Sequence, residues 1–398
     1  MKQTCIVWGA GHYGHALMET LNGEDEYEIL AYCDRDRQLV GKKVGGYDII
    51  SVETAIERCR MDENLVIIIG IFDYRIIEEI QKDIKARFPK HTRVVVGHSI
   101  QDRAENEMLR ACARNRTFQW HVDVEKYFLE WMDNLMSEVE YWVKEVANVR
   151  GRRHVYNRNC RRNHMFTHPA IAQRIRGGET VLDIGCGLVS RFGDRLEDGR
   201  TVRLIPVDAL AHFYNIMNGH IRDGLKENYS CRFGLFEFMG NIFECGFADY
   251  IIIDNALDHC IDPWKSLVEC LYVLKDGGYM YLNHRRAEAV YEGWTGLHKW
   301  NIDCHKGDFI IWNKENAKNV TEELKNYADI KVTFDETVLD RERQNIGVSI
   351  RKKRDFSMAD FFDIDKESVV LMQCMDKMME RWAADSKEFF SMLEQVEM

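Results

Sequence analysis

Short apolar runs alternate along this chain with longer segments whose apolar residues recur every three or four positions. The short runs are typical of buried strands, and the longer segments are typical of amphipathic helices. This alternation occurs in two separate series. It predicts parallel sheets covered by helices, so we expect an α/β protein with two Rossmann-like sheets. The predicted strands are residues 4–8, 28–33, 64–70 and 92–96 in the first series, and 179–184, 202–207, 248–253, 279–282, 308–312, 330–334 and 346–351 in the second.

Two stretches outside these series are predicted to be helical throughout. In residues 123–146, six large apolar side chains recur at helical spacing, and Asp123 is placed to cap the helix. Residues 357–398 are helical and rich in methionine. We expect both to pack between domains or to form contacts in a homo-oligomer. A shorter helix is expected over residues 315–327. The predicted domains are residues 1–100, a helical connector over 101–164, a domain over 165–352, and a helical extension over 353–398.

The second series contains a tight glycine turn at the end of its first strand. The strand passes through Asp183 into Gly185, Cys186 and Gly187. Glycine has no Cβ, so the backbone at this turn can approach a ligand closely. The next strand ends in Asp208, and an acid at that position typically accepts hydrogen bonds from ribose hydroxyls. These residues predict a site for a ligand that contains a nucleoside.

Three motifs in this region follow the order of a known family. The segments VLDIGCG, IPVDAL and NALDHCIDPWKSLVECLYVLKDGG resemble the motifs of class I S-adenosylmethionine-dependent methyltransferases. The resemblance covers about residues 165–352 and implies a Rossmann-like fold, S-adenosylmethionine as cofactor and methyl transfer as activity. A Rossmann unit that holds another adenosine ligand is the alternative. The residues implied to bind the cofactor are Asp183, Gly185, Cys186, Gly187, Asp208, Phe236, Glu237 and Asn255.

The first series carries a glycine fingerprint of its own. Its first strand leads into Gly9, Gly11 and Gly14, and its second strand ends in Asp34. A GxGxxG turn between a strand and a helix, followed by an acid about 20 residues later, is typical of nucleotide sites. The segments GAGHYGHAL, AYCDRD and IIIGIFDYRIIEEI resemble the N-terminal domain of bacterial sugar acetyltransferases and of some methyltransferases encoded with polysaccharide genes. That resemblance implies a nucleotide-sugar site, with an NAD-type site and a scaffolding domain as alternatives.

Three histidines follow strands of the second series, at the edge where open α/β sheets bind their substrates. A hydroxyl acceptor needs a general base, and histidine suits that role because its usual pKa of about 6.5 leaves it largely neutral at cellular pH. His284 ends a strand and His298 lies in the aromatic insertion YEGWTGLHKWN, so these two are the favoured bases. His259 matches a family position that is often structural or beside the cofactor. No cluster of ligands predicts a metal.

Composition restricts the partners and the compartment. The 398 residues carry a net charge of −11, which argues against a general nucleic-acid binder. No apolar run reaches the roughly 20 residues of a membrane-spanning helix, and no signal-peptide pattern opens the chain. Twelve cysteines without a CxxC pair indicate reduced thiols in a cytoplasmic protein. One basic stretch, residues 150–164, contains six arginines and is either a solvated connector or an anion clamp.

Together these patterns predict a methyltransferase that acts on a small molecule. The resemblance of the N-terminal domain favours O-methylation of a sugar, nucleotide-sugar or glycan intermediate of surface polysaccharide biosynthesis. The alternative is methylation of another small metabolite, with the N-terminal domain as a sensor or scaffold.

Overall fold

The chain forms two compact units in the computed structural model, which describes residues 2–23, 26–71, 74–97, 100, 120, 122–147, 165–220, 230–334 and 345–394. Unit 1 contains the described residues up to 100 together with residues 286–301. Unit 2 contains the remaining described residues. Residues 286–301 therefore fold with the N-terminal unit, although they lie inside the domain predicted for 165–352. The arginine-rich stretch lies outside the described residues.

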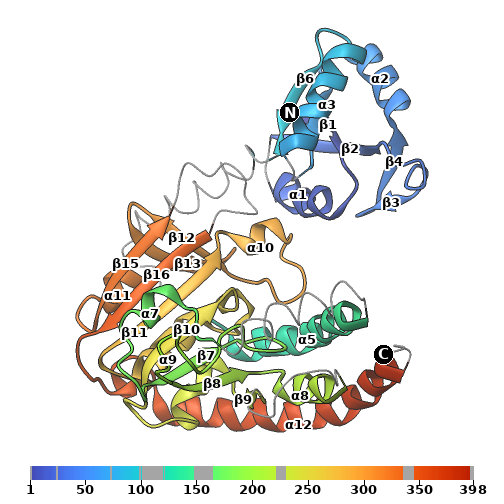
Figure 1. Cartoon of the computed structure of the whole chain (residues 1–398). Helices are drawn as coiled ribbons and strands as arrows, with labels where there is room; N and C mark the ends of the chain where they lie inside the picture. Colours follow the sequence, from blue (N-terminus) through green and yellow to red (C-terminus); the bar gives the residue numbers. More distant parts are fainter. Residues whose placement is uncertain are drawn as a thin grey trace. The chain divides into compact units, whose positions relative to one another are not determined.

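Unit 1 is built on a six-stranded sheet in the order β3-β4-β2-β1-β5-β6 (Figure 1). Every strand pair is parallel except β3 with β4, a hairpin that the sequence pattern did not predict. Alternate residues of β1 face opposite sides: Ile6 and Trp8 pack with α2 and α3, and Cys5 and Val7 pack with α1. The elements are β1 (Gln3–Trp8), α1 (His12–Gly23), β2 (Tyr27–Asp34), β3 (Lys43–Val44), β4 (Tyr47–Ser51), α2 (Val52–Met61), β5 (Val66–Ile69), α3 (Tyr74–Arg87) and β6 (Arg93–Val96).

A short helix from late in the sequence completes unit 1. This helix, α10 (Glu288–Tyr291), packs on α1. The rings of Tyr13 and Tyr291 stack with centroids 6.3 Å apart, and His12 Nε2 lies 2.5 Å from Glu292 Oε2. A Cβ on Gly293 would lie 2.8 Å from the Ala16 Cα. This close approach explains why residues 286–301 group with the N-terminal sheet.

Unit 2 contains a seven-stranded sheet in the order β15-β16-β11-β10-β7-β8-β9. Only β16 runs antiparallel to its neighbours. Numbered along the chain and read from β9, the order is 3-2-1-4-5-7-6, which is the strand order of class I methyltransferases. The fold class expected from the motifs is therefore confirmed. The main-sheet strands are β7 (Thr180–Ile184), β8 (Arg203–Asp208), β9 (Arg232–Phe233), β10 (Ala248–Asp254), β11 (Leu274–Arg285), β15 (Ala328–Phe334) and β16 (Asn345–Lys352).

One predicted strand and one predicted helix of unit 2 turned out differently. The strand over 308–312 does not join the main sheet, because β12, β13 and β14 form a sheet of their own. The helix predicted over 315–327 is wrong in its first part. There the Asn313 side chain accepts hydrogen bonds from the N–H groups of Glu315 and Asn316, and this turn folds β14 back onto β13. The elements concerned are β12 (Asn301–His305), β13 (Asp308–Trp312), β14 (Ala317–Asn319) and α11 (Val320–Leu324).

The two long predicted helices are confirmed, and both belong to unit 2. They are α5 (Val124–Ala147), where the Asp123 carboxylate accepts the N–H of Lys126 as the predicted cap, and α12 (Ile364–Glu394). They contact each other, and Lys377 pairs with Glu125 at 2.9 Å. The other helices of unit 2 are α7 (Pro169–Ala172), α8 (Ala211–His220), η2 (Phe236–Asn241), η3 (Leu257–His259), α9 (Pro263–Val273) and η5 (Met358–Asp360). Among the described helices, none is both long and apolar enough to cross a membrane.

Candidate active site

The glycine turn after β7 has a backbone that other residues would strain. Gly185 and Gly187 have φ angles of 71° and 67°, in the left-handed region. A Cβ on Gly185 would lie 2.4 Å from the Ala256 Cβ and 3.0 Å from the Phe236 ring, so packing alone demands this glycine. Among the described residues, a Cβ on Gly187 would meet only the Trp142 ring, at 3.5 Å. The space beside Gly187 is therefore where a ligand can approach the backbone.

Asp208 connects the tip of β8 to this turn. Its Oδ2 accepts the N–H of Gly187 at 2.9 Å, and its Oδ1 accepts the N–H of Leu210 at 2.9 Å. Burial raises the pKa of the Asp208 carboxyl to about 6. Each carboxylate oxygen has two lone pairs, so both can accept a further hydrogen bond from a ligand hydroxyl. The predicted ribose acceptor thus lies directly beside the glycine turn.

Asp183 and Cys186 are held from inside the protein. Asp183 is 2% exposed, and the Ser190 hydroxyl donates a 2.5 Å hydrogen bond to its Oδ2. Burial raises the pKa of the Asp183 carboxyl to about 7. The Cys186 Sγ lies 3.2 Å from the Sγ of Cys231, and both are free thiols. Asp183 and Cys186, both predicted to bind the cofactor, therefore contact other protein groups and stabilise the glycine turn.

Glu237 and Asn255 fix the neighbouring loops. The Glu237 carboxylate is 3% exposed, and its Oε1 accepts the N–H groups of Ile261 and Asp262. Asn255 has a φ angle of 54°, and its Oδ1 accepts the N–H of Arg285 at 2.8 Å. Glu237 thus organises the loop before α9, and Asn255 ties the tip of β10 to the tip of β11.

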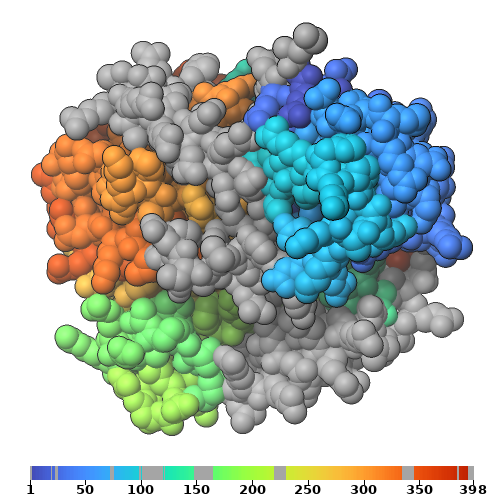
Figure 2. All heavy atoms as spheres, turned by 90° about the horizontal axis from the view of Figure 1, so that it is seen from above, coloured from blue at the N-terminus to red at the C-terminus, as the bar shows by residue number. Residues whose placement is uncertain are grey.

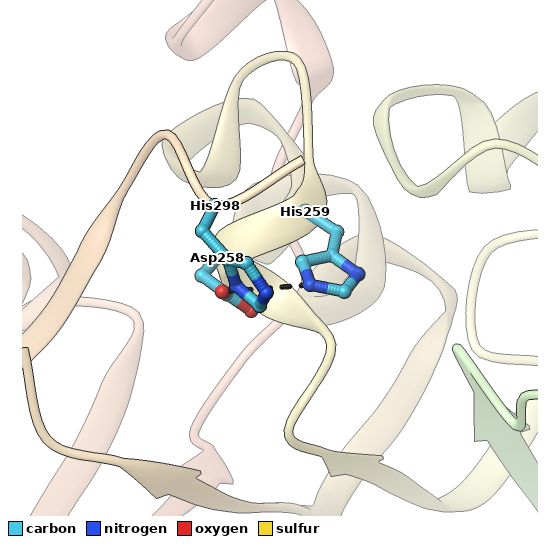
Figure 3. Close-up of side chains that lie close together, drawn as sticks. All are labelled: Asp258, His259 and His298. Atoms are coloured by element: carbon cyan, nitrogen blue, oxygen red, sulfur yellow. Dashed lines mark ion pairs between the residues drawn. The ribbon is translucent and has the colours of Figure 1, made fainter. Parts of the chain in front are cut away.

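A buried acid links two of the predicted histidines. Asp258 is fully buried, and its Oδ1 lies 2.8 Å from Nε2 of His284. Its Oδ2 lies 3.6 Å from Nε2 of His259, the ion pair marked in Figure 3. His284 is also buried, and its Nδ1 bonds the Arg285 carbonyl at 2.7 Å. Both partners of the His284 ring are acceptors, so either the ring carries two protons or Asp258 carries one. In both cases His284 has no lone pair left to accept a proton from a substrate.

The remaining histidines differ in position. His259 is 23% exposed and keeps its ring beside Asp258, so of the two predicted histidines in unit 2 it is the one that can meet a substrate. His298, also drawn in Figure 3, belongs to the segment that folds with unit 1, where its N–H bonds the Thr295 carbonyl. The absence of a metal stays a prediction.

Sequence reasoning missed Asp258 and the role of α5. The Trp131 indole N–H donates to the His259 carbonyl at 2.9 Å, and Trp142 lies beside Gly187. The helix therefore forms a wall of the site. Its tryptophans occupy the predicted apolar stripe, where they could not be told from core residues. Asp258 directly precedes His259 in the quoted motif, and this adjacency was the signal that could have found it.

The N-terminal glycines are not equivalent. A Cβ on Gly14 would lie 1.9 Å from the Gly9 carbonyl oxygen, and a Cβ on Gly9 would lie 2.6 Å from the Gly70 carbonyl oxygen. A Cβ on Gly11 would meet no atom of a described residue within 4 Å. Asp34 accepts the N–H of Ala10 at 2.8 Å and so holds the turn itself. The fold requires Gly9 and Gly14, whereas Gly11 leaves open space.

A family model and several solved structures match parts of the chain. Residues 1–94 match the family described as C2185-like, N-terminal. No curated protein sequence matches the chain. Similar solved structures include a methyltransferase in complex with the Haloferax volcanii Trm112 activator, at 15% identity and a TM-score of 0.33 over 53% of this chain and 98% of that one. A SAM-dependent methyltransferase from Methanosarcina mazei matches at 16% identity and a TM-score of 0.30, over 48% of this chain and 100% of that one.

A third similar structure is the N-methyltransferase NodS from Bradyrhizobium japonicum WM9 in complex with S-adenosyl-L-homocysteine. It matches at 11% identity and a TM-score of 0.33, over 55% of this chain and 99% of that one. At such TM-scores these likenesses add nothing to the strand order described above. By that strand order, unit 2 has a methyltransferase-like fold.

Proposed function

We propose that the protein is an S-adenosylmethionine-dependent methyltransferase that acts on a hydroxyl of a sugar, nucleotide-sugar or glycan intermediate. The observation that carries the proposal is the hydrogen bond from the Gly187 N–H to Asp208, in a sheet with the class I strand order. It joins a turn that a ligand can approach closely to an acid suited to ribose hydroxyls. The open side of Gly187 and the free lone pairs of Asp208 fit an adenosine cofactor.

The cofactor, when bound, supplies an electrophilic methyl group. Methyl transfer is an in-line displacement, so the protein must align the acceptor oxygen with that group and remove its proton. We assign proton removal to His259. Its ring is partly exposed, and the Asp258 carboxylate beside it would stabilise the imidazolium that forms. His284 holds the other oxygen of Asp258 and so fixes the carboxylate in place.

The sugar part of the proposal comes from the resemblance of residues 1–100 to nucleotide-sugar-binding domains. Gly11 supports it, because the turn has open space at the position where a phosphate would approach the backbone. The alternative substrate is another small metabolite, with unit 1 as a sensor or scaffold. Either enzyme would work on soluble intermediates in the cytoplasm.

Calorimetry with S-adenosylhomocysteine tests the core of this proposal. We expect the wild-type protein to bind it, and Asp208→Asn to weaken binding about 10- to 100-fold, because one charged acceptor of two hydroxyls is lost. Asp198→Asn is the matched control, since Asp198 is an exposed acid of the same unit that pairs with Arg200. Equal affinity in wild-type and Asp208→Asn proteins would reject the assignment of the ribose site.

A further inference from the structure

A polar cleft of about 1150 Å³ lies on one face of the sheet of unit 2. Its floor consists of residues from β10, β11, β16 and β15, and its walls consist of residues 167–170, 173–174 and 191–192. Figure 1 shows α7 over this part of the sheet, and Figure 2 shows the green surface after residue 165 bordering the orange surface of residues 302–334. The cleft is larger than the roughly 300–1000 Å³ of common ligand pockets.

The floor presents hydrogen-bonding groups in two rows across the three strands. Tyr281, Ser349 and Lys331 are paired neighbours in one row, and Asn283, Gly347 and Thr333 are paired neighbours in the next. Gly347 has no side chain, and a Cβ there would lie 2.5 Å from the Thr333 hydroxyl oxygen. The Thr333 hydroxyl therefore fills the space above Gly347 and donates to its carbonyl. Hydroxyls, an amide and an aromatic ring together suit a sugar ring, which offers both hydroxyls and apolar C–H faces.

The charge of the cleft is positive in a chain whose net charge is −11. Among its lining residues, Arg191 pairs with Asp254. Arg174 lies over the Tyr279 ring at 4.3 Å and bonds its hydroxyl, with no carboxylate partner among the described residues. Lys331 is exposed and makes no ion pair with any described residue. Two uncompensated cations beside the hydroxyl-rich floor favour an anionic ligand.

The cleft also adjoins the candidate cofactor site along the chain. Asp254 lines the cleft and is followed directly by Asn255, and Arg191 directly follows Ser190, which bonds Asp183. The tip of β10 and the loop that contains Ser190 and Arg191 thus serve both places. A polar sheet face that only meets water is the simpler interpretation. It does not account for the two cations of the cleft, Arg174 at the wall and Lys331 on the floor, that have no carboxylate partner among the described residues.

We propose that this cleft binds a phosphorylated sugar, with the phosphate at Arg174 and Lys331 and the sugar ring over Tyr281 and Asn283. The inference rests on the proposed function in one respect: it takes the bound molecule to be the methyl acceptor. A sugar phosphate and the sugar-phosphate part of a nucleotide-sugar share this chemistry.

The test is calorimetry of the full-length protein with a panel of glucose 1-phosphate, mannose 1-phosphate, N-acetylglucosamine 1-phosphate and UDP-glucose. Glucose and inorganic phosphate serve as separate controls. We expect at least one phosphorylated sugar to bind more tightly than either control. Lys331→Glu should weaken that binding at least tenfold, while Lys325→Glu, the same charge change at an exposed lysine outside the cleft, should alter it less than twofold. Tyr281→Leu should reduce the preference for the sugar phosphate over inorganic phosphate.

The outcomes separate this proposal from the proposed function. If S-adenosylhomocysteine binds but no phosphorylated sugar does, the cleft proposal is overturned and the methyltransferase proposal stands. If a sugar phosphate binds equally well to Lys331→Glu, or if inorganic phosphate binds as tightly as the sugar phosphates, the assignment to this cleft is also overturned. If the cleft binds as expected but S-adenosylhomocysteine does not bind, the methyltransferase proposal fails and the sugar-phosphate site stands. If UDP-glucose binding is lost in Gly11→Val but not in Lys331→Glu, the nucleotide-sugar site lies in unit 1, and its assignment to the cleft is overturned.

Discussion

Buried carboxyls set how single residues of the candidate site respond to pH. The pKa of Asp183 is raised from 3.8 to about 7 because the carboxyl is buried, even though Ser190 donates to it. Between these two pH values the unfolded chain loses a proton that the folded chain keeps. Stability contributed by this site therefore falls as pH rises from about 4 to about 7 and is lowest above that.

Asp183→Asn removes this effect, because asparagine cannot ionise and its Oδ1 can still accept from Ser190. We expect the variant to be more stable than the wild type by about 2–4 kcal/mol at pH 8, and nearly equal to it at pH 4. Urea unfolding at the two pH values measures the difference. A gain of equal size at both values would show that burial of charge is not its cause.

The identity of the base is decided at two histidines that share one acid. His259→Gln keeps the size and part of the hydrogen bonding but cannot accept a proton. We expect kcat to fall about 10²- to 10⁴-fold and the acidic limb of the pH–rate profile to disappear. His284→Gln should retain that limb, because its ring already meets two acceptors. If His259→Gln retains kcat within a few-fold of the wild type, His259 is not the base. Either His298 is then the base, or the acceptor is acidic enough to need none.

The three N-terminal glycines allow a clean test of ligand binding. Gly14→Ala should destabilise unit 1 strongly, since the new Cβ would overlap the Gly9 carbonyl oxygen. Gly11→Val should leave the melting temperature nearly unchanged, because no described residue has an atom within 4 Å of the added Cβ. Thermal shifts with nucleotide-sugars and NAD should then be lost in Gly11→Val. If no nucleotide shifts the wild-type protein, the scaffolding interpretation is favoured.

Individual helices and strands followed the sequence pattern closely where periodicity decides the structure. Most strands of the two main sheets, together with α5 and α12, lie where apolar spacing predicted them, whereas the strands β3, β4 and β9 were not predicted. The pattern failed where side-chain hydrogen bonds decide, as at Asn313, whose turn replaced part of a predicted helix. In the candidate site, the glycine turn and the position of Asp208 could be predicted from the order of the motifs. The pairing of Asp258 with His284 does not, because it joins residues of different strands and loops in space.

The start of α9 supports the loop that carries the candidate base. Asp262 caps this helix by accepting the N–H of Lys265 at 3.0 Å and also accepts the Trp120 indole N–H. Asp262→Ala should lower stability by about 1–2 kcal/mol and reduce kcat, because Asp258 and His259 lie just before the cap. Asn319→Ala, which removes the cap of α11, should cost similar stability without affecting kcat. An unchanged kcat in a destabilised Asp262→Ala enzyme would show that the cap does not position the loop.

For the whole molecule, the division into units does not follow the order of the sequence. Unit 1 needs residues 286–301, so a fragment of residues 1–100 lacks the partner of Tyr13. In the full-length protein, Tyr291→Ala should speed hydrogen exchange of α1 while exchange in β7 and β10 stays unchanged. Hydrogen exchange read by mass spectrometry measures this. Faster exchange spread evenly over both units would show that the segment does not belong to unit 1 alone.

The position of Trp142 beside Gly187 has an optical consequence. The emission of an indole depends on the polarity and the quenching groups around it, so a ligand that enters beside Gly187 should change the fluorescence of this side chain. The chain has nine tryptophans, and comparison with Trp142→Phe isolates its contribution. Trp142 thus serves as an intrinsic fluorescent reporter beside the glycine turn, and cofactor exchange can be followed in real time without any label.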